Sequence, residues 1–255
     1  KAPWFLCRLP RSYAILDRRG GQEILDRLQG VQPWGSAGLF RFLTPGFTPL
    51  QQQAMGDVRR LAVSLSSSRL LSRSFRKAFL NGVTYFNTGH SNLRLAIFEA
   101  IQNLKSRKSI VLIHDLIPIT GSDFTRPEVT ERFKGDMSRV AKFADLVIYN
   151  SNATRTEAET HFASLGRVPA QVTAHLGLAD GFTQDGPFTQ ASAKPGFVIV
   201  GTIEPRKNHA LLLKIWQDFA ATLPEDQIPD LHIIGRRGWN NDQVFQILDQ
   251  ERAIN

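Results

Sequence analysis

Short runs of apolar, β-branched residues alternate with amphipathic stretches through most of the chain. Four of these runs have the length and composition of buried strands, and they lie at residues 83–87, 110–113, 146–149 and 171–175. The stretches between them repeat apolar residues at helical spacing, and Pro127 is predicted to open one helix within a capping box. This alternation predicts an α/β fold, in which a parallel sheet carries helices on both faces.

Polar residues follow two of the predicted strands directly. His114 and Asp115 come after the strand at 110–113, and Asn150 and Ser151 come after the strand at 146–149. Because parallel sheets bind ligands beyond the carboxyl ends of their strands, we expect these four residues at one edge of the sheet. Ser91, after the strand at 83–87, is predicted to cap the next helix.

A second strand-turn-helix unit begins near residue 197. Residues 197–203 read as a strand buried on both faces, and a helix capped by Asn208 follows. Arg206 and Lys207 stand at the start of that helix, where its partial positive charge disfavours cations. A bound phosphate or diphosphate would reverse that effect. The alternative is a solvated Arg-Lys pair balanced by Glu204.

The amino-terminal part carries no identifiable chemistry. Residues 1–50 predict one or two strands, a short helix at 22–28 and a loop. Residues 50–80 read as helical, broken at the serine run 66–68, with six cations against the single acid Asp57. Two interpretations stay open for this basic amphipathic segment: peripheral contact with an anionic membrane, or a solvated helix face.

Composition and net charge limit the kinds of partner and the cellular location that fit this chain. The 255 residues carry a formal charge of +8, which suggests phosphorylated ligands, anionic lipids or nucleic acid as partners. The single cysteine, Cys7, excludes an intrachain disulfide and fits a cytoplasmic protein, and no apolar run reaches membrane-spanning length. We expect an amino-terminal Rossmann-like domain (1–180), a linker (181–196) and a partial carboxyl-terminal Rossmann-like domain (197–255), in which only two strands can be counted.

Four motifs occur in order at residues 113–118, 144–151, 201–208 and 234–239. Together they resemble the family-four group of retaining glycosyltransferases over roughly residues 80–250. The run Gly-Thr-Ile-Glu-Pro-Arg-Lys-Asn is similar to a branch of bacterial mannosyltransferases of surface polysaccharide synthesis. The resemblance implies the GT-B architecture, with an acceptor domain, a nucleotide-sugar domain and catalysis without a metal or cofactor.

The resemblance also implies roles for individual residues. Lys207 and Arg206 would bind the donor diphosphate beside Gly201 and Thr202, and Thr202 stands where most of the family has arginine. Gly235 would begin the nucleobase loop. His114 would be the catalytic-site histidine that contacts the transferred sugar, although a histidine that caps a strand end is the alternative. Asp115, Asn150 and Ser151 would line the cleft, or the last two would cap the following helix, which we favour.

Two family features are not found in this sequence. The glycine-rich acceptor loop near the amino terminus has no match, and the acidic motif with two glutamates is expected beyond Asn255. The resemblance therefore leads us to expect a chain truncated at both ends, which puts the activity of this piece in question.

The function implied is transfer of a hexose, with mannose from GDP-mannose favoured, to a glycan or lipid-linked acceptor with retention of configuration. The location implied is the cytoplasm, peripheral to the inner membrane. Two alternatives stay open. One is a non-catalytic basic module that binds nucleic acid, which the sequence disfavours because basic and aromatic residues are not interleaved. The other is a GT-B relative that epimerises a nucleotide sugar.

Overall fold

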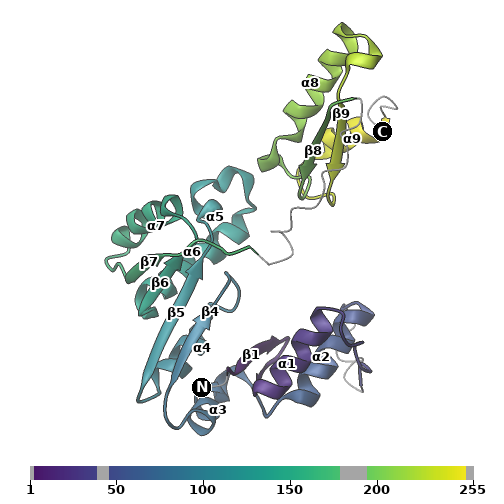
Figure 1. Cartoon of the computed structure of the whole chain (residues 1–255). Helices are drawn as coiled ribbons and strands as arrows, with labels where there is room; N and C mark the ends of the chain where they lie inside the picture. The colour runs from purple at the N-terminus through teal and green to yellow at the C-terminus, as the bar shows by residue number, and fades with distance from the viewer. Residues whose placement is uncertain (1–2, 39–45, 179–193, 251–255) are drawn as a thin grey trace. The chain divides into compact units, whose positions relative to one another are not determined.

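A computed structural model describes residues 3–38, 46–178 and 194–250, and they form two compact units (Figure 1). The first unit comprises Lys1–Ser122 and Pro127–Leu176, and the second comprises Asp123–Arg126 and Gly177–Asn255. The predicted linker, 181–196, lies outside the described residues except for 194–196. The predicted domain boundaries therefore stay a prediction.

The first unit begins with a small antiparallel sheet in the order β1-β2-β3 (Phe5–Leu9, Ser12–Leu16 and Ser64–Ser66). The helices α1 (Arg18–Leu28) and α2 (Pro49–Leu61) pack on it around Leu16 and Ile24. Asp17 caps α1, because its Oδ1 accepts from the N–H of Gly20 at 2.9 Å. The helix predicted at 22–28 thus begins earlier, at Arg18.

The segment at 50–80 differs from its prediction. It forms α2, then strand β3, then a short 3-10 turn (Ser68–Leu70) and helix α3 (Leu71–Ala78). The predicted break into two helices is confirmed, but the prediction of helix at Ser64 and Leu65 is wrong, because Ser64–Ser66 pair with β2, a contact that local periodicity does not encode. In α3, Leu71 and Phe75 are buried while Arg73, Arg76 and Lys77 face solvent. The basic segment is therefore two separate helices.

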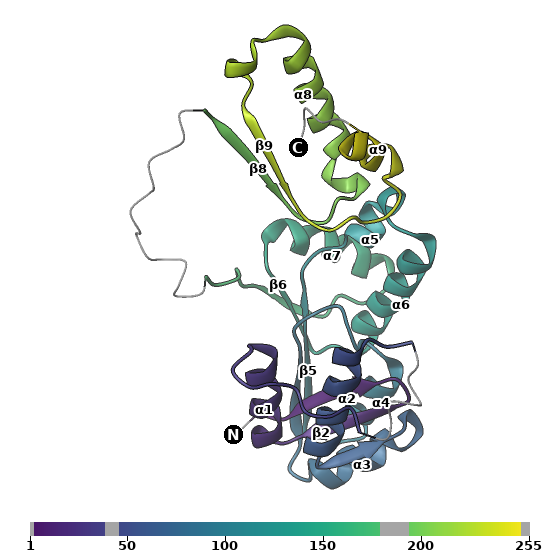
Figure 2. The ribbon, with the colours of Figure 1, turned by 90° about the vertical axis from the view of Figure 1, so that its right-hand side faces the viewer.

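The centre of the first unit is the parallel sheet β4-β5-β6-β7 (Figure 1), and its two middle strands, β5 and β6, are labelled in Figure 2 as well. Its strands and the helices that connect them are β4 (Val83–Asn87), α4 (Leu95–Gln102), β5 (Arg107–Ile113), α5 (Ile117–Thr120), α6 (Pro127–Phe143), β6 (Leu146–Tyr149), α7 (Asn152–Ser164) and β7 (Ala170–Thr173). The predicted parallel α/β fold is confirmed, and the helix predicted at Pro127 begins there. It is compatible with a Rossmann-like domain. The helix after β4 begins four residues beyond Ser91, which does not cap it.

The strands of this sheet bury one face more deeply than the other. In β5, Val111 and Ile113 are fully buried, whereas Ile110 and Leu112 are only half-buried. The buried face packs against α4, α6 and α7 through residues such as Met137 and Phe162. Helices were expected on both faces, whereas this core places α4, α6 and α7 against one face.

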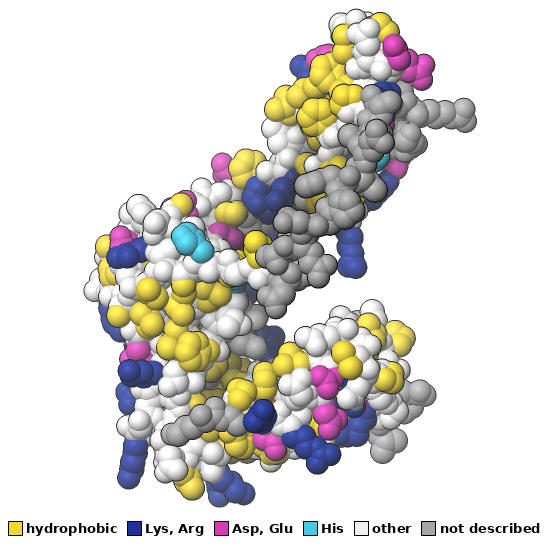
Figure 3. Space-filling model, viewed as in Figure 1, with side chains coloured by type: hydrophobic (Ala, Val, Ile, Leu, Met, Phe, Trp, Pro, Cys, Tyr) yellow, Lys and Arg dark blue, Asp and Glu magenta, His cyan; other side chains and the backbone are white. Residues whose placement is uncertain are grey.

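The second unit contains a two-stranded parallel sheet of β8 (Gly196–Val200) and β9 (Asp230–Ile234), with helices α8 (His209–Thr222) and α9 (Asp242–Gln250). Its core includes Ile203, Leu213 and Val244. The strand at 197–203 was expected to be buried on both faces, but Val198 and Val200 are 62% and 69% exposed. That expectation is wrong because Val198 and Val200 share one face of the sheet with Ile234, whereas, among the described residues, the core of this unit is built on the other face, at Leu231 and Ile233. Figure 3 shows apolar side chains on the surface of this unit.

Among the described residues, no helix is both long enough and apolar enough to cross a membrane.

The core of the first unit offers a matched test of burial. Leu93 is 1% exposed and belongs to the main core cluster, whereas Leu28 is 67% exposed at the end of α1. Leu93→Ala is expected to lower the free energy of unfolding by about 2 to 5 kcal/mol, because it removes buried methyl groups and leaves a cavity. Leu28→Ala is expected to change it by less than about 0.5 kcal/mol. Urea denaturation followed by circular dichroism measures both, and equal losses would contradict the core described here.

Candidate functional site

The carboxyl edge of the parallel sheet gathers the predicted polar residues of the first unit. His114 and Asp115 follow β5, and Asn150 and Ser151 follow β6, which pairs with β5 in parallel register. The segment after β4 reaches the same place, because the Nε2 atom of His114 lies 3.1 Å from the carbonyl oxygen of Thr88. The structure therefore brings all four predicted residues to one edge.

His114 is held in a defined orientation. Because a carbonyl oxygen can only accept, the 3.1 Å contact with Thr88 requires Nε2 of His114 to carry the proton. Its Nδ1 atom is then a hydrogen-bond acceptor in the neutral ring. The hydroxyl of Thr154 donates to the backbone carbonyl of His114 at 3.1 Å, which fixes the main chain at this point. A neutral imidazole in this state can accept a hydrogen bond from a hydroxyl group.

His90 supports His114 and was not identified as functional from the sequence. Its Nε2 atom accepts the backbone N–H of His114 at 3.0 Å, and the two rings lie 5.5 Å apart in an edge-to-face arrangement. The His90 ring also packs against Phe133 at 5.1 Å. Burial is the main cause that lowers the pKa of His90, and the neighbouring His114 lowers it further. The charges of Asp115 and Asp136 raise this pKa and oppose the effect.

The other three residues of this edge make local hydrogen bonds. Ser151 caps α7, since its Oγ accepts the N–H of Thr154 at 3.1 Å, so the favoured helix-capping role is confirmed for Ser151. The Oδ1 atom of Asn150 lies 3.3 Å from the Thr154 hydroxyl and shares its single proton with the nearer carbonyl of His114. The Oδ1 atom of Asp115 accepts the N–H of Ile117 at 3.1 Å. A cleft-lining role for these side chains stays a prediction.

In the second unit, two glycines allow the ends of β8 and β9 to meet. A Cβ added to Gly235 would lie 1.8 Å from the carbonyl oxygen of Gly201, which no side chain could tolerate. Gly201 itself has a φ of 147°, in the region that favours glycine. Beyond the strands, Ile203 N–H donates to the carbonyl of Arg236 at 2.9 Å. The loops after β8 and β9 are therefore joined into one surface that includes Thr202.

Lys207 and Arg206 differ in their surroundings. Lys207 is exposed, and its Cε lies 3.7 Å from the position that a Cβ would take on Gly201. Arg206 forms an ion pair of 2.5 Å with Glu204, whose carboxylate is buried. The structure thus brings Gly201, Lys207 and Gly235 together. It pairs Arg206 with Glu204, the acid named in the alternative interpretation of the Arg-Lys pair.

Helix α8 begins directly after Asn208, as predicted, but the Asn208 side chain does not cap it. The reason is its left-handed backbone, with φ 52° and ψ 40°, whereas a capping residue has an extended one. The first N–H groups of α8 therefore lack the predicted side-chain acceptor. His209 follows and is buried, and burial is the main cause that lowers its pKa.

Comparison with known proteins gives distant, partial matches. A stretch of 159 residues is 26% identical to a serotype-specific mannosyltransferase WbdA of Escherichia coli, and another protein of that name matches at 24%. The stretch covers 56% of this chain and 19% of each relative, so it spans about a fifth of their length. No family model matches the chain. No solved structure matches it significantly.

The contact between Gly201 and Gly235 can be tested by adding one methyl group. Gly235→Ala is expected to destabilise the second unit by more than about 2 kcal/mol, because the backbone must separate to relieve the collision. Gly196→Ala is the matched control in β8, where the nearest atoms to an added Cβ, in His232, lie 3.9 Å away. Thermal unfolding measures both variants. Equal destabilisation would contradict the close approach of the two loops.

The lowered pKa of His90 predicts a pH dependence. Folding keeps His90 neutral at pH values where the unfolded chain already binds a proton, so stability is fully present above about pH 6.5 and falls as the pH decreases below it. His90→Gln retains an acceptor but does not titrate. The decline in the free energy of unfolding between pH 7.5 and 5 is expected to be shallower in this variant.

The exposed His232→Gln variant controls for the loss of an imidazole. Urea unfolding at several pH values gives the slopes. An unchanged slope in His90→Gln would show that His90 does not stay neutral in the folded protein.

Proposed function

We propose that this chain is part of a glycosyltransferase that moves a hexose, with mannose from GDP-mannose favoured, to a glycan or lipid-linked acceptor. Its distant similarity to mannosyltransferases supports the reaction class. The proposal includes retention of configuration, no metal or cofactor, and a cytoplasmic location at the surface of the inner membrane. The exposed cations of α3 would then contact that membrane peripherally.

The observation that carries the proposal is the position of Lys207 over Gly201, beside Gly235. Gly201 has no side chain, and the atom nearest to the position of an added Cβ is Cε of Lys207, so a diphosphate can approach this backbone beside the lysine. The start of α8 adds N–H groups and the partial positive charge of a helix terminus. A flexible ammonium, uncapped N–H groups and bare backbone in one place form a suitable environment for a nucleotide diphosphate.

Catalysis at this surface would be electrostatic. Negative charge develops on the diphosphate as the bond to the sugar breaks, and a cation that is already in place stabilises that charge. We assign this role first to Lys207, whose ammonium is exposed. Arg206 would contribute as well, but its guanidinium is shared with the buried carboxylate of Glu204. Thr202 and Gly235 would contact the nucleotide through the backbone.

In the first unit, we propose that His114 contacts the transferred sugar. With Nε2 bound to the Thr88 carbonyl, Nδ1 is the ring atom that can accept a hydrogen bond from a sugar hydroxyl. His90 would act as a positioning residue, because it holds the backbone of His114 rather than the substrate. Asp115, Asn150 and Ser151 complete the edge.

Calorimetric titration with GDP, UDP and ADP, with and without their sugars, tests the donor site. We expect one nucleotide to bind, and Lys207→Ala to weaken it by about 1.5 to 3 kcal/mol, the range for a hydrogen bond to a charged group. This corresponds to roughly 10- to 150-fold in the dissociation constant. Lys214→Ala removes the same charge from the exposed side of α8 and is expected to leave the affinity within about twofold.

Equal weakening by both lysine variants would indicate a general charge effect and would contradict the proposed site. Tight binding of nucleic acid that nucleotide sugars do not displace would favour the alternative basic module. Interconversion of sugar nucleotides without transfer would favour an epimerase.

A further inference from the structure

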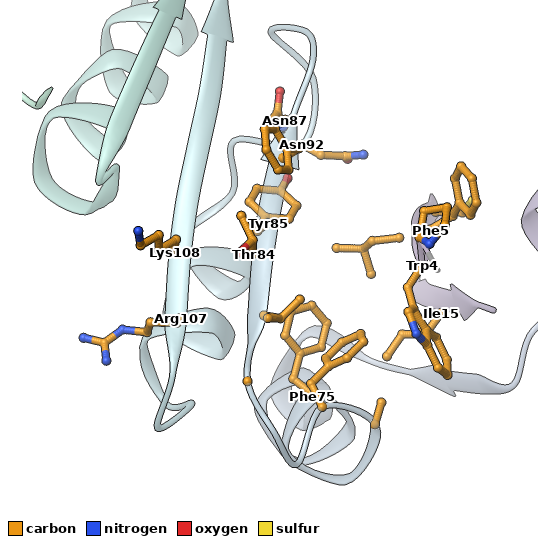
Figure 4. A pocket seen from close by; sticks show the side chains of 18 of the residues that line it. Trp4, Phe5, Ile15, Phe75, Thr84, Tyr85, Asn87, Asn92, Arg107 and Lys108 are labelled. Atoms are coloured by element: carbon orange, nitrogen blue, oxygen red, sulfur yellow. The ribbon is translucent and has the colours of Figure 1, made fainter. Parts of the chain in front are cut away.

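A groove in the first unit is lined by none of the residues assigned above to donor and sugar, although its lining includes Thr88, whose carbonyl binds His114. Its volume is about 1060 Å³, and its walls come from β1 and β4 (Figure 4). Phe75, Phe79 and Ile15 form much of its apolar floor. Neither the predicted sites nor the proposed function uses this groove.

The groove lies against the edges of two strands rather than against their faces. Every residue of β4, from Val83 to Asn87, lines it, as do the consecutive residues Phe5, Leu6 and Cys7 of β1. Successive side chains of a strand point to opposite faces of the sheet, so a cavity that touches all of them must run along the strand edge. Among the described residues, β1 pairs only with β2, and β4 pairs only with β5.

The unpaired backbone groups of β4 can be identified. The N–H of Val83 donates to the carbonyl of Ser106 on the β5 side at 2.9 Å. Because the N–H groups of a strand alternate in direction, those of Thr84 and Phe86 point the other way, towards the groove.

The length of the groove suits a short extended chain. It follows all five residues of β4, which at ~3.4 Å per residue is a strand of ~17 Å. An extended segment of about five residues can therefore lie along it.

The charges of the groove also favour an uncharged occupant. Among the described residues, its only charged lining residues are Arg107 and Lys108, and Figure 4 shows both pointing away from the space between β1 and β4. A lipid phosphate would therefore find no cation of the described residues facing it. The apolar chain of a lipid would leave the strand-edge N–H and C=O groups unpaired, whereas an extended polypeptide pairs with them.

We propose that this groove binds one extended polypeptide strand, which pairs with β4 and β1 and joins the three-stranded and four-stranded sheets into one. The occupant has alternating apolar side chains, because the floor at Phe75 and Phe79 is apolar. This mode of recognition is strand addition to a sheet edge, and here the added strand would pair with β4 on one side and with β1 on the other. The proposal does not rest on the proposed glycosyltransferase activity.

The probe is an acetylated, amidated peptide of alternating valine and threonine with a lysine at each end, added to the full chain. The control peptide carries N-methyl groups on alternate residues, which removes the hydrogen-bond donors. We expect saturable binding that N-methylation weakens by roughly tenfold or more, and slowed hydrogen exchange at the amides of Thr84 and Phe86. Cys7, the only cysteine, lines the groove, so its alkylation rate gives a second readout of occupancy.

Phe86→Pro removes one groove-facing N–H without removing a bond to β5, and it is expected to weaken peptide binding by roughly tenfold or more. Phe86→Ala keeps that N–H and serves as the matched control, with circular dichroism confirming that both variants fold. The proposal is overturned if millimolar peptide changes neither the amide exchange nor Cys7 alkylation. It is also overturned if a manno-oligosaccharide or an alkyl detergent protects Cys7 while the peptide does not.

Discussion

The parallel pairing of β5 with β4 and β6 is the constraint on which the first unit depends. In parallel register, all three strands end at the same edge of the sheet. Residues that are far apart in the chain therefore lie close together there. His114 is bound from both sides, by Thr88 after β4 and by Thr154 after β6. An antiparallel neighbour would have placed one of these partners at the opposite end of the sheet.

The second unit applies the same rule with fewer strands. β8 and β9 end together, and the absence of side chains at Gly201 and Gly235 lets their loops touch. This arrangement has a consequence for charge. Lys207 lies above the bare backbone, whereas Arg206 turns to Glu204, so two adjacent cations that look equivalent in the sequence are not equivalent in space. The fold thus separates a lysine with an exposed ammonium from an arginine that is partly neutralised.

Much of the fold follows from local pattern, and the exceptions have a common cause. The strands at 83–87 and 146–149 and the helix starting at Pro127 were predicted to the residue, because apolar runs and proline act locally. Strand β3, the exposure of β8 and the role of His90 were missed. Each depends on a partner distant in sequence or on which face of a sheet the helices cover, and periodicity reports neither. The lack of a side-chain cap from Asn208 was missed because the left-handed backbone of this residue is set by the preceding turn.

The positive charge of the chain is less available for binding than its total suggests. Arg139 donates to the carbonyl of Leu93 and to Asp136, and Arg167 donates to the carbonyls of Ala141 and Ala144 at the end of α6. These guanidinium groups satisfy backbone oxygens and a buried carboxylate, so they stabilise the fold instead of forming an anion-binding face. The formal net charge of +8 therefore favours polyanion binding only weakly. The charge that matters for a phosphorylated ligand is local, and in the second unit it is the exposed ammonium of Lys207 beside an uncapped helix start.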